Sequence, residues 1–212
     1  MSDESLKRAV VLTRRSLIGL SLTPAAMLFA PAVLAQSDRA AGAVEEMKGE
    51  AFAEKASVRR ALDRAAPVFM RDQIGTGGGS RVTMKLGRDT TLKLGEWGRV
   101  VIDRYLVDAG GEITLGSGAM LFDRPAGAKP APVTVRSPFG LIAVRGTRFF
   151  AGPSNNVFGV FVAHGRVTVT AAGQSVTLRA GEGTNIAHPG GVPTPPSRWG
   201  EPRIISAMLA VN

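Results

Sequence analysis

Short runs in which apolar and polar residues alternate dominate the chain beyond Pro67. Val82, Met84 and Leu86 alternate with polar neighbours, which places three apolar side chains on one face of a strand. Similar short runs follow, separated by Gly, Asn and Pro turn residues. Because each such strand has one apolar face, two sheets must pack face to face to bury it. The pattern therefore predicts an all-β fold, an antiparallel β-sandwich or jelly-roll-like domain with many short strands.

The pattern divides the chain into segments. Residues 36–66 are expected to be a partly ordered lead-in, and 50–66 is the stretch in which a helical pattern competes. Residues 67–188 form the expected β domain. A Pro-rich tail with a short apolar end follows over 189–212, and the proline run is expected to lie extended on the surface. The apolar end, 204–211, is expected to return to the sheet or pack across it.

The first 35 residues have the layout of an export signal. Four cations precede an uncharged apolar run, Ser16–Leu34, and small residues lead up to Ala35, where cleavage is expected. The segment Thr13–Ile18 places Arg14 and Arg15 directly before the apolar run, which resembles the twin-arginine export motif. The general secretory route and a retained membrane anchor stay open as alternatives. We expect a periplasmic or otherwise exported protein, with no stable membrane span after cleavage.

The composition limits the binding partners and the reactive groups that the chain can have. The formal charge is +9, with 26 Lys and Arg against 17 Asp and Glu. In an exported protein such a surplus points to anionic envelope components rather than nucleic acid, and the scattered cations also fit an ordinary solvated surface. The chain has no Cys, which excludes disulfides, thiolate metal sites and cysteine nucleophiles. It has two His.

The second half of the chain carries motifs in a fixed order. The central one, V-R-S-P-F-G-L-I-A-V-R-G-T-R-F over 135–149, resembles the signature of the FecR domain family. Three further segments are similar to that family's pattern: Asp72–Gly77, Gly165–Val169 and Val176–Glu182. The resemblance spans about Gly42 to Ala187.

This resemblance implies a signalling domain. The family includes regulators of iron–siderophore uptake that join a cytoplasmic anti-sigma segment, one transmembrane helix and a periplasmic sensor domain. Only about 15 residues precede the apolar run here, so we expect a stand-alone exported domain without the anti-sigma segment. The expected role is protein interaction or signalling in the cell envelope, through a sheet edge or the loop 125–132. A module that binds an anionic envelope glycan is the alternative.

Five residues are candidates for interaction or structural roles: Arg145, Gly146, Thr147, Arg148 and Trp97. Gly146 interrupts a strand, which predicts a bulge or a close backbone approach. We interpret Arg145 as a structural tie rather than a ligand contact, because an inward arginine needs a carboxylate or carbonyl partner.

A glycan-binding module would need exposed aromatic rings. Trp97 lies in a Gly-Glu-Trp-Gly turn, where exposure is expected, and Tyr105 and Trp199 are the other candidates.

Motifs for catalysis are weak. The segment Gly75–Ser80 lacks the Gly-Lys-Ser/Thr ending of a phosphate-binding loop. The two histidines, His164 and His188, show no metal-ligand clustering. Asp103 and Glu112 could serve an envelope hydrolase, but any antiparallel fold offers such carboxylate pairs. We therefore expect a non-enzyme with no catalytic residue, metal or cofactor.

Overall fold

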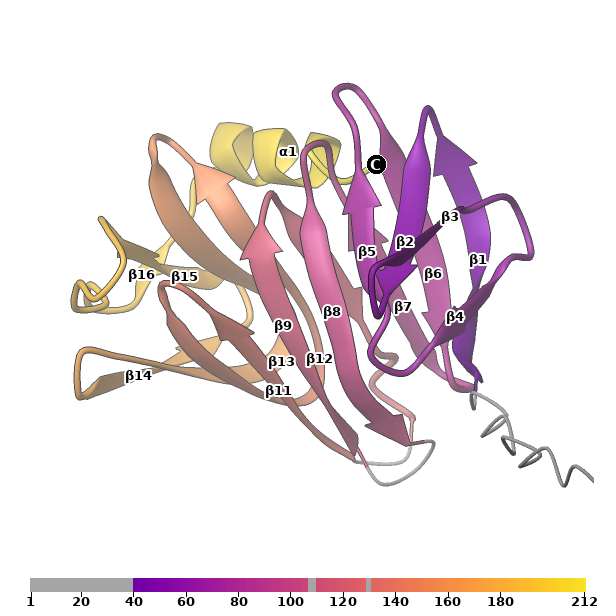
Figure 1. The fold of residues 1–212 in the computed structure, drawn as a ribbon. Helices are drawn as coiled ribbons and strands as arrows, with labels where there is room; N and C mark the ends of the chain where they lie inside the picture. Colours follow the sequence, from indigo (N-terminus) through magenta and orange to yellow (C-terminus); the bar gives the residue numbers. More distant parts are fainter. Residues whose placement is uncertain (1–39, 107–109, 129–130) are drawn as a thin grey trace, which may run out of the picture. The chain divides into compact units, whose positions relative to one another are not determined.

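The structure is a computed structural model that describes residues 40–106, 110–128 and 131–212, with only the backbone at Tyr105 and Leu106. The expected export signal, residues 1–35, lies outside the described residues. Within the described part the chain forms sixteen strands and one helix (Figure 1). The strands are β1 (Ala40–Lys48), β2 (Ala51–Lys55), β3 (Val58–Ala61), β4 (Pro67–Phe69), β5 (Gln73–Thr76), β6 (Arg81–Leu86), β7 (Thr90–Leu94), β8 (Arg99–Leu106), β9 (Gly110–Ser117), β10 (Met120–Asp123), β11 (Pro132–Ser137), β12 (Gly140–Ser154), β13 (Val157–Ala171), β14 (Gln174–Arg179), β15 (Glu182–Ile186) and β16 (Ser197–Arg198); the helix is α1 (Glu201–Leu209).

The strands belong to one hydrogen-bonded sheet that curls so that two layers face each other (Figure 1). Its order is β3-β2-β5-β8-β9-β11-β12-β10-β7-β6-β1-β4, and β13 pairs with β12, β14 and β15. The long hairpin β12–β13 joins the layers. The first half of β12 pairs with β11, while its second half pairs with β10. The all-β expectation is confirmed, and the sandwich is continuous through this hairpin.

Alternation along the strands supplies the core between the layers. In β6 the side chains of Val82, Met84 and Leu86 are buried while their neighbours are more exposed, as the sequence pattern predicts. Pairing is antiparallel throughout the described ladders except between β9 and β11, which run parallel. Glu112 of β9 and Arg136 of β11 form an ion pair across these two strands.

Residues 40–66 are part of the sheet rather than a lead-in. The helix that competes in the sequence over 50–66 is not formed, since β2 and β3 occupy this stretch. Ala51 and Ala53 are buried on the inner face of β2, where small residues fit against the opposite layer. Strand pairing thus overrides the helix propensity of Ala, Glu, Lys and Arg.

One buried carboxylate fixes this edge of the sheet. The Asp72 carboxylate, 1% exposed, accepts hydrogen bonds from the Arg60 guanidinium and from the backbone N–H of Phe69. It therefore ties β3 to the turn between β4 and β5, and the burial of a charge is offset by two donors.

The C-terminal segment packs on the outer face of one layer. Helix α1 and the preceding Trp199 cover Leu121, Phe150 and Phe161, which form a second apolar cluster outside the main core. This explains why the sequence is continuously apolar at 120–122 and 149–151: these strands are buried on both faces. Among the described residues α1, with nine residues, is the only helix, and it falls far short of a membrane-spanning length.

Candidate functional site

The residues singled out in the V-R-G-T-R-F motif lie where β12 changes layer. Gly146 has φ of +59°, and the register of β12 against β13 shifts between Arg145 and Arg148. Gly165 of β13 faces this point with φ of +86°, and a Cβ there would lie 2.6 Å from the carbonyl oxygen of Gly146. The irregularity predicted at Gly146 is therefore present, and two glycines with left-handed φ let the hairpin bend.

The side chains around the bend differ in their contacts and in their burial. Arg148 approaches Asp123 of β10 at 3.7 Å, and the Nε2 atom of His164 lies 3.7 Å from the same carboxylate. Asp123 of β10 thus faces side chains of both β12 and β13. Thr147 points inward and is fully buried. Arg145 is exposed and makes none of the ion pairs found among the described residues, so the contact expected of a structural tie is made by Arg148 instead.

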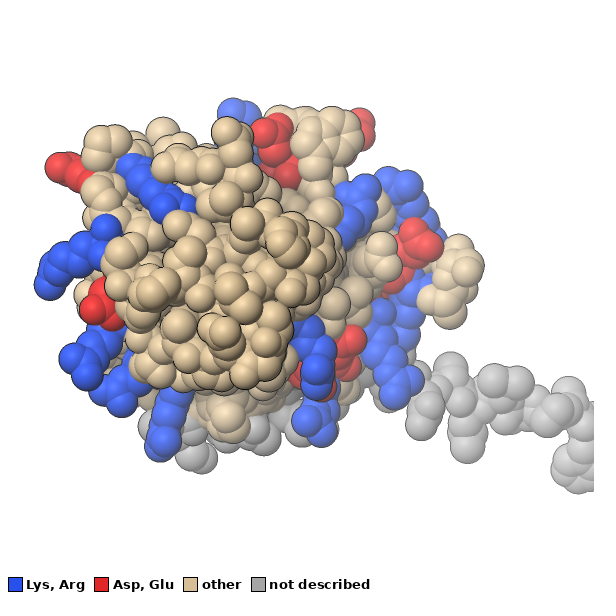
Figure 2. Space-filling model, turned by 90° about the vertical axis from the view of Figure 1, so that its left-hand side faces the viewer, with Lys and Arg blue, Asp and Glu red and all other residues tan. Residues whose placement is uncertain are grey.

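One face of the molecule is nearly free of charge. Three stretches of the sequence, 149–165, 167–178 and 183–197, contain no Lys, Arg, Asp or Glu. They supply most of β12–β15 and the loop before β16, which occupy the left of Figure 1. Figure 2 views the molecule from this side and shows a broad uncharged area framed by Lys and Arg. We call it the uncharged face.

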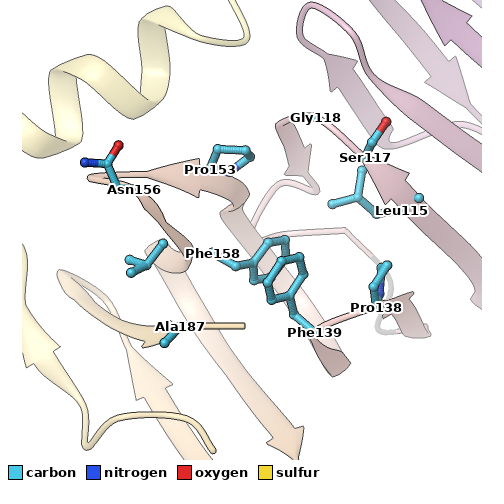
Figure 3. Close-up of a pocket in the computed structure, with 11 residues that line it drawn as sticks. Leu115, Ser117, Gly118, Pro138, Phe139, Pro153, Asn156, Phe158 and Ala187 are labelled. Carbon is cyan, nitrogen blue, oxygen red and sulfur yellow. The ribbon is translucent and has the colours of Figure 1, made fainter. Parts of the chain in front are cut away.

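An apolar pocket of about 400 Å³ opens beside this face (Figure 3). Phe139 and Phe158 stack at its base, with ring centroids 4.4 Å apart and planes 5° from parallel. Its wall is completed by turn and strand-end residues: Leu115, Gly116, Ser117, Gly118, Pro138, Pro153, Asn156, Val157 and Ala187. The lining is apolar at the base and polar only at Ser117 and Asn156, which fits a hydrophobic side chain rather than a charged ligand.

Local sequence places Phe139 in this pocket. The Ser137 hydroxyl accepts the backbone N–H of Phe139 at 3.2 Å and donates to the carbonyl of Gly140 at 3.1 Å, which closes the turn between β11 and β12. Gly140 has φ of +147°, where a Cβ would lie 2.5 Å from the carbonyl oxygen of Thr170. The Ser-Pro-Phe-Gly motif is therefore a turn that presents a phenylalanine, a role that sequence reasoning missed.

Trp97 lies in a different place from the bend. It is 65% exposed in the turn between β7 and β8, as expected, with φ of +52°. It borders a groove of about 620 Å³ that also contains Phe52, Arg59 and Arg99. The Arg59 guanidinium lies 3.4 Å from the centre of the Phe52 ring, and Arg99 lies 4.9 Å from it. Phe52 is therefore stacked against arginines, and Trp97 is the open ring of this groove.

The other sequence candidates for a glycan site do not join Trp97. Trp199 is 6% exposed and is enclosed by Phe161, at 5.1 Å between centroids, and by the Arg203 guanidinium at 3.6 Å. Its expected role as an exposed ring is wrong, because α1 and its N-terminal approach cover it. The side chain of Tyr105 lies outside the described residues, as do residues 129 and 130 of the loop expected to bind a partner.

The groups that could support catalysis each have a separate environment. His188 contacts the carbonyl of Pro189, while His164 lies beside Asp123. Asp103 accepts a hydrogen bond from Thr114 at 2.7 Å, and Glu112 pairs with Arg136. The Arg136 hydrogen bond, followed by its charge, holds the pKa of Glu112 below its usual value. In the part of the chain that the structure describes, no three His, Asp or Glu residues gather as a metal site would require.

The bend and the Ser-Pro-Phe-Gly turn lie in a part of the chain that matches a known protein family. The family model described as FecR protein matches residues 72–168. This part of the chain matches the FecR domain. It extends from the turn before β5 into β13, so it contains the bend, the Ser-Pro-Phe-Gly turn and Arg145, but not β14, β15 or α1. No curated protein matches the chain.

Two solved structures share the fold. Both are crystal structures of a candidate anti-sigma factor from Parabacteroides distasonis ATCC 8503, at 1.65 Å and 2.50 Å resolution. Their TM-scores are 0.54 and 0.53 at 16% sequence identity. The likeness covers 64% of this chain and 64% or 63% of those chains, so it leaves over a third of each neighbour unmatched. At this identity the likeness concerns the fold alone.

Proposed function

We propose that this chain is an exported, non-enzymatic FecR-type module that acts by binding a protein partner in the cell envelope. The observation that carries the proposal is the apolar pocket of Phe139 and Phe158 at the edge of the uncharged face. FecR domains and the candidate anti-sigma factors with the same fold belong to signalling systems, which supports a role in signal transfer.

The charge distribution supports a protein as the partner. The chain carries a formal charge of +9, yet the uncharged face has long stretches without an ionic side chain. The centres of protein interfaces are depleted of charged residues and enriched in aromatic ones. A pocket of about 400 Å³ also has room for one apolar side chain, which would act as an anchor when it enters between Ser117 and Ala187.

Photocrosslinking in living cells tests the proposal. A benzophenone amino acid replaces Ser117, an exposed residue at the pocket, and the attached species is identified by mass spectrometry. The Ala187→Arg variant adds a charge at an exposed position of the same pocket and is expected to abolish the adduct. Val58→Arg adds the same charge to β3, an edge strand that contributes no residue to the pocket, at a 70% exposed position, and is expected to preserve the adduct.

The outcomes of this experiment separate the candidate functions. One protein adduct that Ala187→Arg removes and Val58→Arg retains supports the proposal. No protein adduct, or an adduct that both variants retain, contradicts it.

Binding of an envelope glycan is the second candidate, favoured by the open Trp97 ring beside Arg99. A sugar could stack on this ring while the arginine meets an acidic substituent. Because the nearby Phe52 ring is already covered by two guanidinium groups, a single ring would have to hold the glycan. If Trp97→Ala abolishes retention of the full chain on envelope polysaccharide, the glycan function replaces the first.

Export of the module is tested at its N-terminus. Cleavage after Ala35 gives a mature protein that begins at Gln36. Mass spectrometry of the protein from the periplasmic fraction is expected to show this terminus. If export uses the twin-arginine route, replacing Arg14 and Arg15 by Lys is expected to keep the protein out of the periplasmic fraction. A mass that begins at Ser2 would contradict cleavage.

A further inference from the structure

Three exposed arginines stand in register on neighbouring strands of the outer sheet face. Arg145 of β12 is paired with Arg166 of β13, and Arg166 is paired with Arg179 of β14. All three border one open groove of about 830 Å³. Neighbouring strands lie about 4.8 Å apart, so the row spans about 10 Å. We call it the arginine row.

The arginine row destabilises the folded protein when no ligand is bound to it. Like charges directly opposite each other on adjacent strands repel, and Arg166 meets one on each side. None of the three takes part in the ion pairs found among the described residues. Glu182, close in sequence, directs its Oε2 atom to the backbone N–H of Arg179 at 2.8 Å, and it is paired with Arg198 across β15 and β16. Among the residues that the structure describes, the guanidinium groups of the row thus have no carboxylate partner.

We propose that the arginine row binds an acidic, extended peptide segment of the partner protein. This inference rests on the proposed function, since it names the chemistry of a segment that the same partner would present. Guanidinium groups bind carboxylates in bidentate geometry, and a row of them along one line can meet successive acidic side chains of an extended chain. The ligand would supply the negative charge that the three arginines lack.

The surroundings favour a peptide over an acidic glycan. The remaining residues that line the groove are Pro132, Ala143, Val144, Gly165, Thr168 and Ala180. None of these offers an aromatic ring on which a sugar could stack. Beyond the row, Ala143, Thr168 and Thr177 lie opposite one another, so the face continues as a flat strip of small residues on which an extended backbone can lie.

Binding of labelled hexaglutamate to the purified full chain tests this inference. At low ionic strength Arg166→Gln is expected to weaken binding about tenfold, the size of one charge-assisted hydrogen bond. Arg88→Gln removes the same charge from the exposed turn between β6 and β7, and its affinity is expected to match that of the unmodified protein. The urea midpoint of Arg166→Gln is expected to equal or exceed that of the unmodified protein, because a repulsion is relieved.

The results distinguish this inference from the proposed function. Ala187→Arg is expected to bind hexaglutamate normally even though it blocks the apolar pocket. Equal losses in Arg166→Gln and Arg88→Gln would show that only net charge matters and would overturn the inference. An oligogalacturonate that binds the row more tightly than hexaglutamate would also overturn it, in favour of an acidic glycan. A lower urea midpoint for Arg166→Gln would contradict the repulsion argument.

Discussion

At the scale of single residues, two glycines decide how the sheet can fold over. Gly146 and Gly165 face each other with positive φ where the hairpin β12–β13 passes from one layer to the other. The sequence indicated Gly146, because it interrupts an apolar strand within a recognisable motif. The matching role of Gly165 depends on the pairing of two strands and on the buried Thr147 beside it, which sequence alone does not reveal.

Substituting these positions tests the close approach. In Gly165→Ala the added methyl meets Thr147 and the Gly146 carbonyl, and we expect a loss of about 2–4 kcal/mol in the free energy of unfolding. Gly173→Ala is the matched control, since Gly173 has φ of +76° but no atom near the added carbon. Strain alone is expected to cost this variant about 1 kcal/mol. Equal losses in urea unfolding would show that crowding at the bend is unimportant.

At the scale of elements, alternation predicted strands well where one face is exposed. It failed over 50–66, where helix-forming residues build β2 and β3. The pattern of apolar and polar residues also did not predict the helix over 201–209. Helix α1 begins after a Pro-rich segment and is stabilised by contacts with residues remote in sequence. Arg203, for example, reaches Ser154 at 3.0 Å and Asn185 at 2.7 Å. Such tertiary contacts override local propensity, so they are invisible to periodicity.

The parallel pairing of β9 and β11 carries a pH-dependent contribution. Arg136 lowers the pKa of Glu112 in the folded protein, so the pair stabilises the fold at neutral pH. This contribution is lost as the pH falls through the lowered pKa and the carboxylate becomes protonated. We expect Glu112→Gln to lower the urea midpoint slightly at neutral pH, because an exposed pair is screened by solvent.

The difference between Glu112→Gln and the unmodified protein is expected to vanish in acid. Glu45→Gln, at an exposed position outside the ion pairs found in the described part of the chain, serves as the control and is expected to show no such trend. A difference that persists after the carboxylate is protonated would contradict this origin.

At the scale of the whole molecule, charge is segregated in a way that the overall count conceals. A formal charge of +9 and scattered cations suggested an ordinary solvated surface. Folding gathers uncharged segments on one face. It also aligns Arg145, Arg166 and Arg179 across three paired strands. The pocket could not be predicted, because Phe139 and Phe158 lie at opposite ends of the hairpin β12–β13 and meet only because the hairpin bends in the middle. The expected site residues themselves fall into separate places, with Trp97 in its own groove.

Hydrogen–deuterium exchange on the complex of this protein with its captured partner tests the central claim most directly. If the uncharged face is the docking surface, backbone amides in 153–158 and 185–192 become protected on binding. The turn that carries Trp97 and the strand β3 then exchange as in the free protein. Protection confined to residues 95–99 and the neighbouring groove, with 153–158 unchanged, would contradict the account.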